Sequence, residues 1–311
     1  MFFGTYGTLI VLVGMVVVFW VASPSAFGTL ENFRNILADM APGAVIAAGL
    51  TMVLVAGDFD LSVGYQASFA GVLVVGLLAR QHYPIPVAIL TVLGLGVVFG
   101  IVNGLIVTKL GVNAFIATLG TGTLIIGLNY AYSGGVPIQL SSGRGLTRIG
   151  LGSLAGVPYP ILIMVGVLLV LWVLLNLTTL GQHMKATGNN IDVARRLGVR
   201  VDGARITAFV LAGVCATGTG IMLSAILGNG DTTAGDVYLL QSYAAAFLGS
   251  AALRDGEFHI LGTAVGILTV AVGYNGLAIL GAPTFAQYAF AGGLLVVAVA
   301  LSTLSRRYAR D

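Results

Sequence analysis

The segment GQHMKATGNNIDVARRLGVRVDGAR, residues 181–205, is a polar stretch between two long apolar stretches of this chain. It carries 5 of the 14 Lys and Arg residues of the sequence. Because so polar a segment is costly in lipid, it must lie in water or against a protein. Its residues predict a short helix, which Asn189 and Asn190 cap, residues 191–197 form and Gly198 ends. A capped basic helix between apolar stretches favours a cytoplasmic docking surface for a soluble partner.

The composition places the rest of the chain in a membrane. Of the 311 residues, 58% are hydrophobic and 8% are charged, and the mean hydropathy is +1.01. A soluble domain has about 25% charged residues, so this chain could not cover itself with polar surface. The 45 glycines fit close packing of helices in lipid.

Apolar stretches along the chain predict an all-α polytopic membrane protein. A spanning helix needs about 20 apolar residues. About ten stretches approach this length, and they lie near residues 6–22, 36–56, 62–80, 85–107, 114–132, 159–177, 204–227, 237–253, 258–279 and 284–303. The stretches near 62–80 and 237–253 are short and rich in Gly or Ala, so we expect broken or tilted helices there. Residues 1–311 are predicted to form one transmembrane domain, with residues 178–203 as its cytoplasmic loop.

The distribution of Lys and Arg over the short loops predicts the orientation. With the N-terminus inside, the inner loops and the tail hold Lys109, Lys185, Arg195, Arg196, Arg200, Arg205, Arg254, Arg306, Arg307 and Arg310. The outer side then holds Arg34, Arg80, Arg144 and Arg148. This excess of inner basic residues predicts that both termini are cytoplasmic.

Two pairs of similar segments indicate an internal repeat. NGLIVTKLGVNAF begins at Asn103 and NGLAILGAPTF begins at Asn275, while GDFDLSVGYQA begins at Gly57 and GDVYLLQSYAA begins at Gly235. In the predicted topology the two copies face opposite sides of the membrane. Residues 36–132 and 204–303 are therefore predicted to form inverted repeats, an arrangement common in transporters. Chance similarity between apolar sequences is the alternative.

The motif GDFDLSVG, residues 57–64, puts two carboxylates at the end of a long apolar stretch. Acidic residues at membrane depth are costly and mark functional sites, so Asp58 and Asp60 could form a proton or cation site. The favoured interpretation is a turn, in which Asp58 caps the next helix while Asp60 and Ser62 satisfy free backbone N–H groups. No intramembrane basic partner for either acid is evident.

A polar stripe follows the predicted span near 114–132. Thr118, Thr121 and Asn129 recur at near-helical spacing, with Phe115 one turn before Thr118. Hydroxyl and amide groups match sugar hydroxyls, and an aromatic ring matches the C–H face of a sugar, so the stripe could line a solute pathway. Phe285 is the predicted repeat counterpart of Phe115. Hydrogen bonding between buried helices is an equal alternative.

The sequence lacks the motifs of several other functions. Neither lysine of the chain follows the glycines of a phosphate-binding loop, so any ATPase must be a separate chain. No metal site is predicted, because the single Cys215 lies in an apolar run and the three histidines are far apart. The basic residues lie beside apolar stretches, as membrane topology requires, which argues against nucleic-acid binding.

Four segments together resemble the ribose-type ABC sugar permeases. GDFDLSVG is similar to the Gly-Gly-Ile-Asp-Leu-Ser-Val-Gly signature of that family, and GVNAFIATLGTGTLIIGLNYAYSGGVPI to its central helix and outer loop. KATGNNIDVARRLGVRVDGARITAFVLAG resembles the cytoplasmic coupling loop, and NGLAILGAPTFAQYAFAGGLLVVAVAL the last hairpin. The resemblance extends from about Asn35 to Arg307 in the family's order.

This resemblance implies the permease subunit of a binding-protein-dependent importer in a bacterial inner membrane. Two permease copies, identical or sister chains, would sit on two ABC ATPase domains, and an external binding protein would deliver a monosaccharide. ATP and Mg²⁺ would bind the partner ATPase, with no cofactor in this chain. The positions matching the family's coupling element are Gly188, Asn189, Asn190, Ala194, Arg195, Leu197 and Gly198.

Two departures from the family pattern leave the substrate open. Asp58 and Phe59 replace a Gly and an Ile of the signature, and residues 250–257 replace a Gly-rich loop. The chain could therefore be a permease of the same superfamily for a non-sugar molecule. It could also be an ion-coupled secondary transporter or channel that uses Asp58 or Asp60, or a membrane scaffold or receptor.

Overall fold

The structure is a computed structural model and is almost entirely helical. It describes residues 2–140, 145–252, 256–283 and 285–300, apart from positions 288, 295, 298 and 299. The longer helices are α1 (Phe2–Ala22), α3 (Leu30–Val55), α4 (Val63–Ala79), α5 (Ile85–Thr108), α6 (Ala114–Ser133), α8 (Tyr159–Leu177), α11 (Val201–Leu227), α12 (Asp236–Ser250) and α13 (Ile260–Ile279). The predicted all-α class is confirmed.

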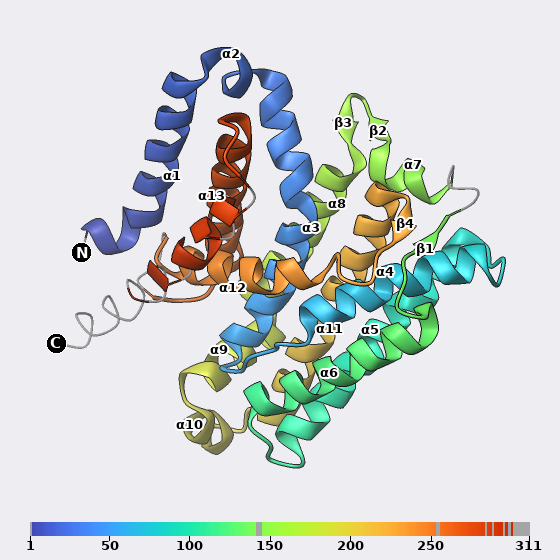
Figure 1. The fold of residues 1–311 in the computed structure, drawn as a ribbon. Helices are drawn as coiled ribbons and strands as arrows, with labels where there is room; N and C mark the ends of the chain where they lie inside the picture. The colour runs from blue at the N-terminus through green and yellow to red at the C-terminus, as the bar shows by residue number, and fades with distance from the viewer. Residues whose placement is uncertain are drawn as a thin grey trace.

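Short elements connect these helices. The short helices are α2 (Pro24–Phe27), α7 (Leu146–Leu151), α9 (Thr179–Asn189) and α10 (Ile191–Arg196). Two antiparallel pairs of two-residue strands join β1 (Ile138–Gln139) to β4 (Asn229–Gly230), and β2 (Ser153–Leu154) to β3 (Val157–Pro158). In Figure 1, α9 and α10 lie at the lower end of the molecule, and the β2–β3 hairpin lies at the upper end.

Six of the described helices are long and apolar enough to cross a membrane, namely α3, α5, α6, α8, α11 and α13. The 17 residues of α4 and the 15 residues of α12 span about 26 Å and 22 Å at 1.5 Å per residue, which is less than the ~30 Å hydrocarbon core. The predicted span near 284–303 falls partly outside the described residues, as do Arg144, Arg254 and the basic C-terminal tail. The count of ten spans and the orientation therefore stay predictions.

Helix α11 lies at the centre of the bundle, where it packs against α3, α4 and α5. Glycines make the close contact with α5 possible. A Cβ on Gly100 would lie 2.4 Å from the Cα atom of Val210, and a Cβ on Gly96 would lie 2.5 Å from the carbonyl oxygen of Gly213. This is the packing by small residues that the glycine content predicts for helices in lipid.

The helix contacts follow a reciprocal pattern. Helices α4 and α5 pack on α11, while α12 and α13 pack on α3. An inverted repeat that pairs α3 with α11, α4 with α12 and α5 with α13 gives this exchange of partners. The repeat itself stays a prediction, supported by the reciprocal contacts.

Candidate coupling site and solute pathway

Helix α10 begins and ends where the local sequence signals placed it. The side-chain Oδ1 of Asn190 accepts a hydrogen bond of 3.0 Å from the Val193 N–H and caps the N-terminus. At the other end, Gly198 adopts a φ of +82°. Its N–H donates to the Arg195 carbonyl, and the Val199 N–H donates to the Ala194 carbonyl, at 3.1 and 3.0 Å. These two bonds form a Schellman motif, which needs a residue of positive φ. Asn189 is the last residue of α9.

The outer face of α10 combines apolar and basic side chains. Val193 and Leu197, one turn apart, are 51% and 77% exposed, whereas Ala194, on the adjoining face, is buried. Arg195 and Arg196 are exposed beside them. A helix that presents two aliphatic side chains flanked by guanidinium groups has the chemistry of a helix that docks into a protein groove.

Backbone contact joins the end of α9 to the end of α3. A Cβ on Gly188 would lie 2.0 Å from the carbonyl oxygen of Val55, and a Cβ on Gly57 would lie 3.2 Å from the Cα atom of Gly188. Gly57 itself has a φ of +86°. The absence of a side chain at Gly188 therefore lets the α9–α10 segment rest directly on α3.

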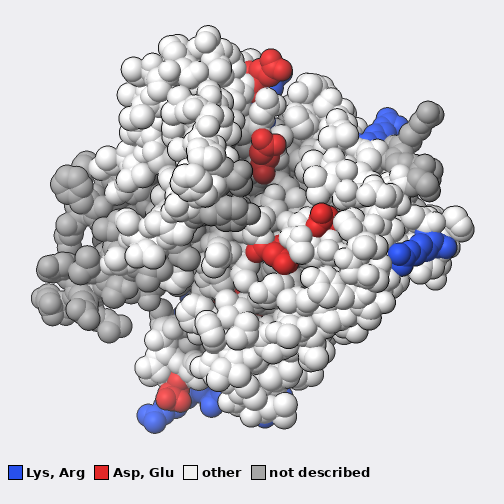
Figure 2. All heavy atoms as spheres, in the orientation of Figure 1, with Lys and Arg blue, Asp and Glu red and all other residues white. Residues whose placement is uncertain are grey.

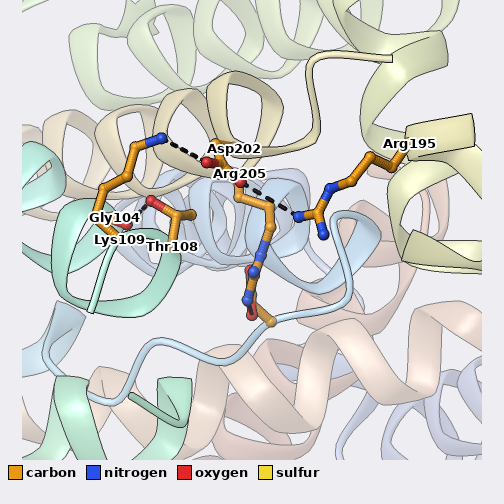
Figure 3. Close-up of polar contacts among 7 residues, drawn as sticks. Gly104, Thr108, Lys109, Arg195, Asp202 and Arg205 are labelled. Carbon is orange, nitrogen blue, oxygen red and sulfur yellow. Dashed lines mark hydrogen bonds and ion pairs between the residues drawn. The ribbon is translucent and has the colours of Figure 1, made fainter. Parts of the chain in front are cut away.

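Ion pairs join α10 to the transmembrane helices, as Figure 3 shows. Asp202, in the first turn of α11, accepts from the Lys109 ammonium at 2.5 Å and lies 3.7 Å from the Arg195 guanidinium. Lys109 follows α5, so one carboxylate bridges α5, α10 and α11. These three side chains are 34–62% exposed. Figure 2 shows basic side chains gathered at this lower end of the molecule.

A buried ion pair lies next to this exposed network. Both carboxylate oxygens of Asp58 accept hydrogen bonds from Arg205, at 2.6 and 2.7 Å. The two side chains are 6% and 16% exposed. The predicted capping role of Asp58 is wrong, because both its oxygens bind the guanidinium of α11 and no side chain caps α4. A basic partner for this acid does exist, on a helix distant in sequence.

Asp60 forms the predicted turn, whereas the hydroxyl of Ser62 bonds to side chains and not to the backbone N–H group that was predicted. One carboxylate oxygen of Asp60 accepts from both the N–H and the hydroxyl of Ser62, at 2.9 and 2.5 Å. Ser62 also accepts from Gln66 and Asn103 at 2.7 and 2.9 Å. All four side chains are buried. They tie the start of α4 to α5 by hydrogen bonds within one subunit.

The polar residues of the α6 stripe are buried or half-buried. Thr118 is fully buried, accepts from the Leu61 N–H and donates to the Ala114 carbonyl. Thr121 is half-buried and donates to the Asn103 amide oxygen at 2.7 Å. Asn129 is buried and donates to the Thr232 carbonyl at 2.9 Å. Of these contacts, the bond from Thr121 to Asn103 joins two helices, α6 and α5, while the others stay within α6 or reach residues of connecting segments.

The two phenylalanines of the predicted pathway lie on exposed surface. Phe115 is 52% exposed and Phe285 is 74% exposed. Their role in solute passage stays a prediction.

The sequence analysis did not predict that Arg205 pairs with Asp58. It used Lys109 only to predict the membrane orientation and did not predict its ion pair with Asp202. One signal could have found the first pair. Asp58 directly follows the predicted span near 36–56, and Arg205 begins the span near 204–227, so both residues lie at the same predicted membrane depth. Opposite charges at one depth are candidates for pairing.

Replacing Gly198 with proline should abolish transport and stimulation of the partner ATPase. Proline is restricted to a φ near −65°, whereas this position has a φ of +82°, and proline also removes the N–H that donates to Arg195. The protein should still insert into the membrane, because α10 lies outside the apolar helices. The measurement is solute uptake and ATPase activity of the reconstituted transporter.

The matched control for this proline variant is Gly198→Asn. Asparagine tolerates the left-handed conformation better than other non-glycine residues, so this variant should keep most of the uptake. Full uptake by a well-inserted Gly198→Pro protein would contradict a coupling role for the α10 geometry.

Comparison with known proteins identifies the relatives of this chain. The family model described as branched-chain amino acid transport system / permease component matches residues 32–299. The ribose import permease protein RbsC of Bacillus subtilis is 35% identical over 288 residues, which cover 92% of this chain and 89% of the relative. No solved structure matches the chain.

Two further relatives carry the names of other sugars. The galactose/methyl galactoside import permease protein MglC of Haemophilus influenzae is 31% identical and covers 98% of this chain and 94% of its own length. The xylose transport system permease protein XylH of the same organism is 28% identical, with coverage of 97% and 96%. The similarity thus extends along nearly the whole of each chain.

Proposed function

We propose, since this chain belongs to the branched-chain amino acid transport system / permease component family, that it is the permease subunit of an ABC importer for a monosaccharide. It is a multi-pass protein of the inner membrane, as its apolar helices and permease relatives indicate. The proposal includes a second permease copy, a partner ATPase that binds ATP and Mg²⁺, and an external solute-binding protein. The N- and C-termini are proposed to be cytoplasmic.

The observation that carries the proposal is the mechanical link from α10 to the bundle. The exposed α10 is connected to α11 and α5 by the Asp202 ion pairs, and α9 rests on α3 at Gly188. Movement of a partner that grips α10 is therefore passed to three central helices through direct contacts. A permease that obtains its energy from a separate ATPase needs such a link.

The names of the relatives favour a sugar over another small molecule. Different relatives carry the names of ribose, galactose and xylose. We therefore propose a monosaccharide as the substrate and do not choose among these sugars. The alternative of an ion-coupled transporter needs a carboxylate that is free to bind an ion. Asp58 does not fit this role, because it is paired with Arg205. Asp60, the second acid, serves as the acceptor of a buried turn.

Reconstitution in liposomes tests this function. Uptake of ribose, galactose or xylose should require ATP, the partner ATPase and the binding protein together with this chain. Liposomes that contain this chain alone should be inactive under a proton or sodium gradient. Gradient-driven uptake by the isolated chain would overturn the proposal in favour of a secondary transporter.

An Asp60→Asn variant separates the structural turn from an ion-coupling carboxylate. The amide oxygen can accept the same two hydrogen bonds from Ser62, so uptake should stay near the unmodified level. Asp60→Ala removes the acceptor and should cost about 1–3 kcal/mol, the penalty for buried donors left without a partner. Normal expression of Asp60→Asn with loss of uptake would identify a titrating acid.

A further inference from the structure

A polar cavity lies toward the end of α3 opposite to the coupling segment, residues 188–198. It has a volume of about 300 Å³, the lower end of the range of small-molecule pockets. Its wall includes residues 36–43 of α3, the first turns of α12 and the second half of α13. Gly43 lies 12 residues before Val55, where α9 rests, which places the cavity about 18 Å along the helix from that contact. In the proposed orientation this is the outer half of the protein.

The cavity combines the two kinds of groups that recognise a sugar. Its polar and aromatic lining consists of Asp39, Tyr238, Gln241, Tyr274, Asn275 and Gln287. A carboxylate and amides accept and donate hydrogen bonds to hydroxyl groups, and the faces of tyrosine rings pack against C–H groups. Side chains that differ in donor and acceptor capacity could thus contact one small polyhydroxy solute.

The neighbouring contacts hold this lining in place. The ring of Tyr238 lies beside Gly43 of α3, at 3.4 Å from where a Cβ on that glycine would be. The ring of Tyr274 packs edge-on against Phe290, with centroids 6.2 Å apart. Asn275 exchanges two hydrogen bonds with Asn32, at 3.0 and 2.9 Å. The rings of Tyr238 and Tyr274 and the amide of Asn275 are therefore held by protein contacts in the absence of a solute.

The carboxylate of Asp39 is the accessible group of the lining. Asp39 is exposed, whereas Gln241 and Tyr238 are half-buried deeper in the wall. Figure 2 shows acidic side chains along the middle of one face of the molecule, away from the basic lower end. Asp39 thus supplies an accessible carboxylate that can accept hydroxyl protons at the cavity.

We propose that this cavity between α3, α12 and α13 is a monosaccharide-binding site within a single permease subunit. Asp39 and Gln241 bind hydroxyl groups there, and Tyr238 and Tyr274 pack on the sugar ring. The site rests on the proposed importer function and deepens it. It lies apart from α6, so it is distinct from the polar stripe that the sequence singled out.

The test uses a cysteine inside the cavity. Ala278→Cys, at an exposed lining position with no proposed contact to the sugar hydroxyls, is made in a Cys215→Ser background. The variant is reconstituted with the partner ATPase but without ATP or binding protein, and is labelled with a water-soluble maleimide. Ribose, galactose or xylose should slow the labelling saturably, and leucine should not. Asp39→Asn in the same background should raise the half-protecting sugar concentration about tenfold, since a hydrogen bond to a charged acceptor is replaced by a neutral one.

The control is Thr233→Cys, on the exposed segment before α12, whose labelling should not respond to sugar. The site is overturned if Ala278→Cys fails to label, if no sugar protects it, if Thr233→Cys is slowed equally, or if Asp39→Asn has no effect. Protection by leucine alone would contradict the sugar class. ATP-driven sugar uptake without protection would overturn only this site and leave the importer function standing.

Discussion

Asp58→Ala should destabilise the protein by about 3 kcal/mol, near the lower end of the range for breaking a buried ion pair. The variant leaves the Arg205 guanidinium without its two acceptors in a site where that side chain is 16% exposed. The remaining exposure lets water solvate part of the charge, which keeps the cost from being larger. Unfolding by SDS in mixed micelles measures the change, and uptake should fall with it.

The exposed ion pair of the same region provides the control. Asp202→Ala breaks the bond to Lys109, whose side chain is 58% exposed, so the expected cost is below about 1 kcal/mol. The charge exchange Asp58→Arg with Arg205→Asp should recover part of the stability lost in Asp58→Ala. Equal effects of Asp58→Ala and Asp202→Ala would show that burial does not set the strength of these pairs.

Gly188→Ala should uncouple the α9–α10 segment from the bundle. The new Cβ would lie 2.0 Å from the Val55 carbonyl oxygen, whereas Cβ contacts below 3.0 Å essentially never occur. The segment must therefore move by about 1 Å, and overpacking of this kind costs about 1–3 kcal/mol. We expect ATP-driven uptake to fall roughly tenfold or more, while the membrane-embedded helices stay folded.

Gly203→Ala is the matched glycine substitution for this experiment. Gly203 lies in the first turns of α11, and the nearest atom to its new Cβ would be 3.9 Å away. Alanine is also the better helix former, by about 1 kcal/mol, so stability and uptake should be kept. Unchanged uptake in a well-expressed Gly188→Ala protein would refute the idea that the backbone contact with α3 transmits motion.

The two ends of helix α10 could be predicted from the local sequence. Asn190 and Gly198 predicted the two ends of α10 because a cap and a left-handed turn depend on atoms within a few residues. The same reasoning placed the turn of Asp60, whose two bonds from Ser62 span two residues. It failed for Asp58, whose partner lies 147 residues away.

The polar stripe of α6 shows what a periodic pattern of residues cannot predict. Helical spacing correctly predicted that Thr118 and Thr121 share part of one helix. It could not predict that Leu61 and Asn103 would satisfy the two hydroxyl groups. Periodicity identifies a face of a helix, and only the neighbouring helices determine whether that face meets protein, lipid or solute.

The sequence by itself determined that this is a helical membrane protein with a polar segment that forms a short capped helix. Apolar length and local capping are properties of neighbouring residues and need no knowledge of the fold. Only the tertiary structure decided that Arg205 neutralises Asp58, that Gly188 rests on Val55, and that Asp39 shares a cavity with Gln241. These relations depend on how close helices distant in sequence approach one another, and that distance is set by packing across the whole bundle.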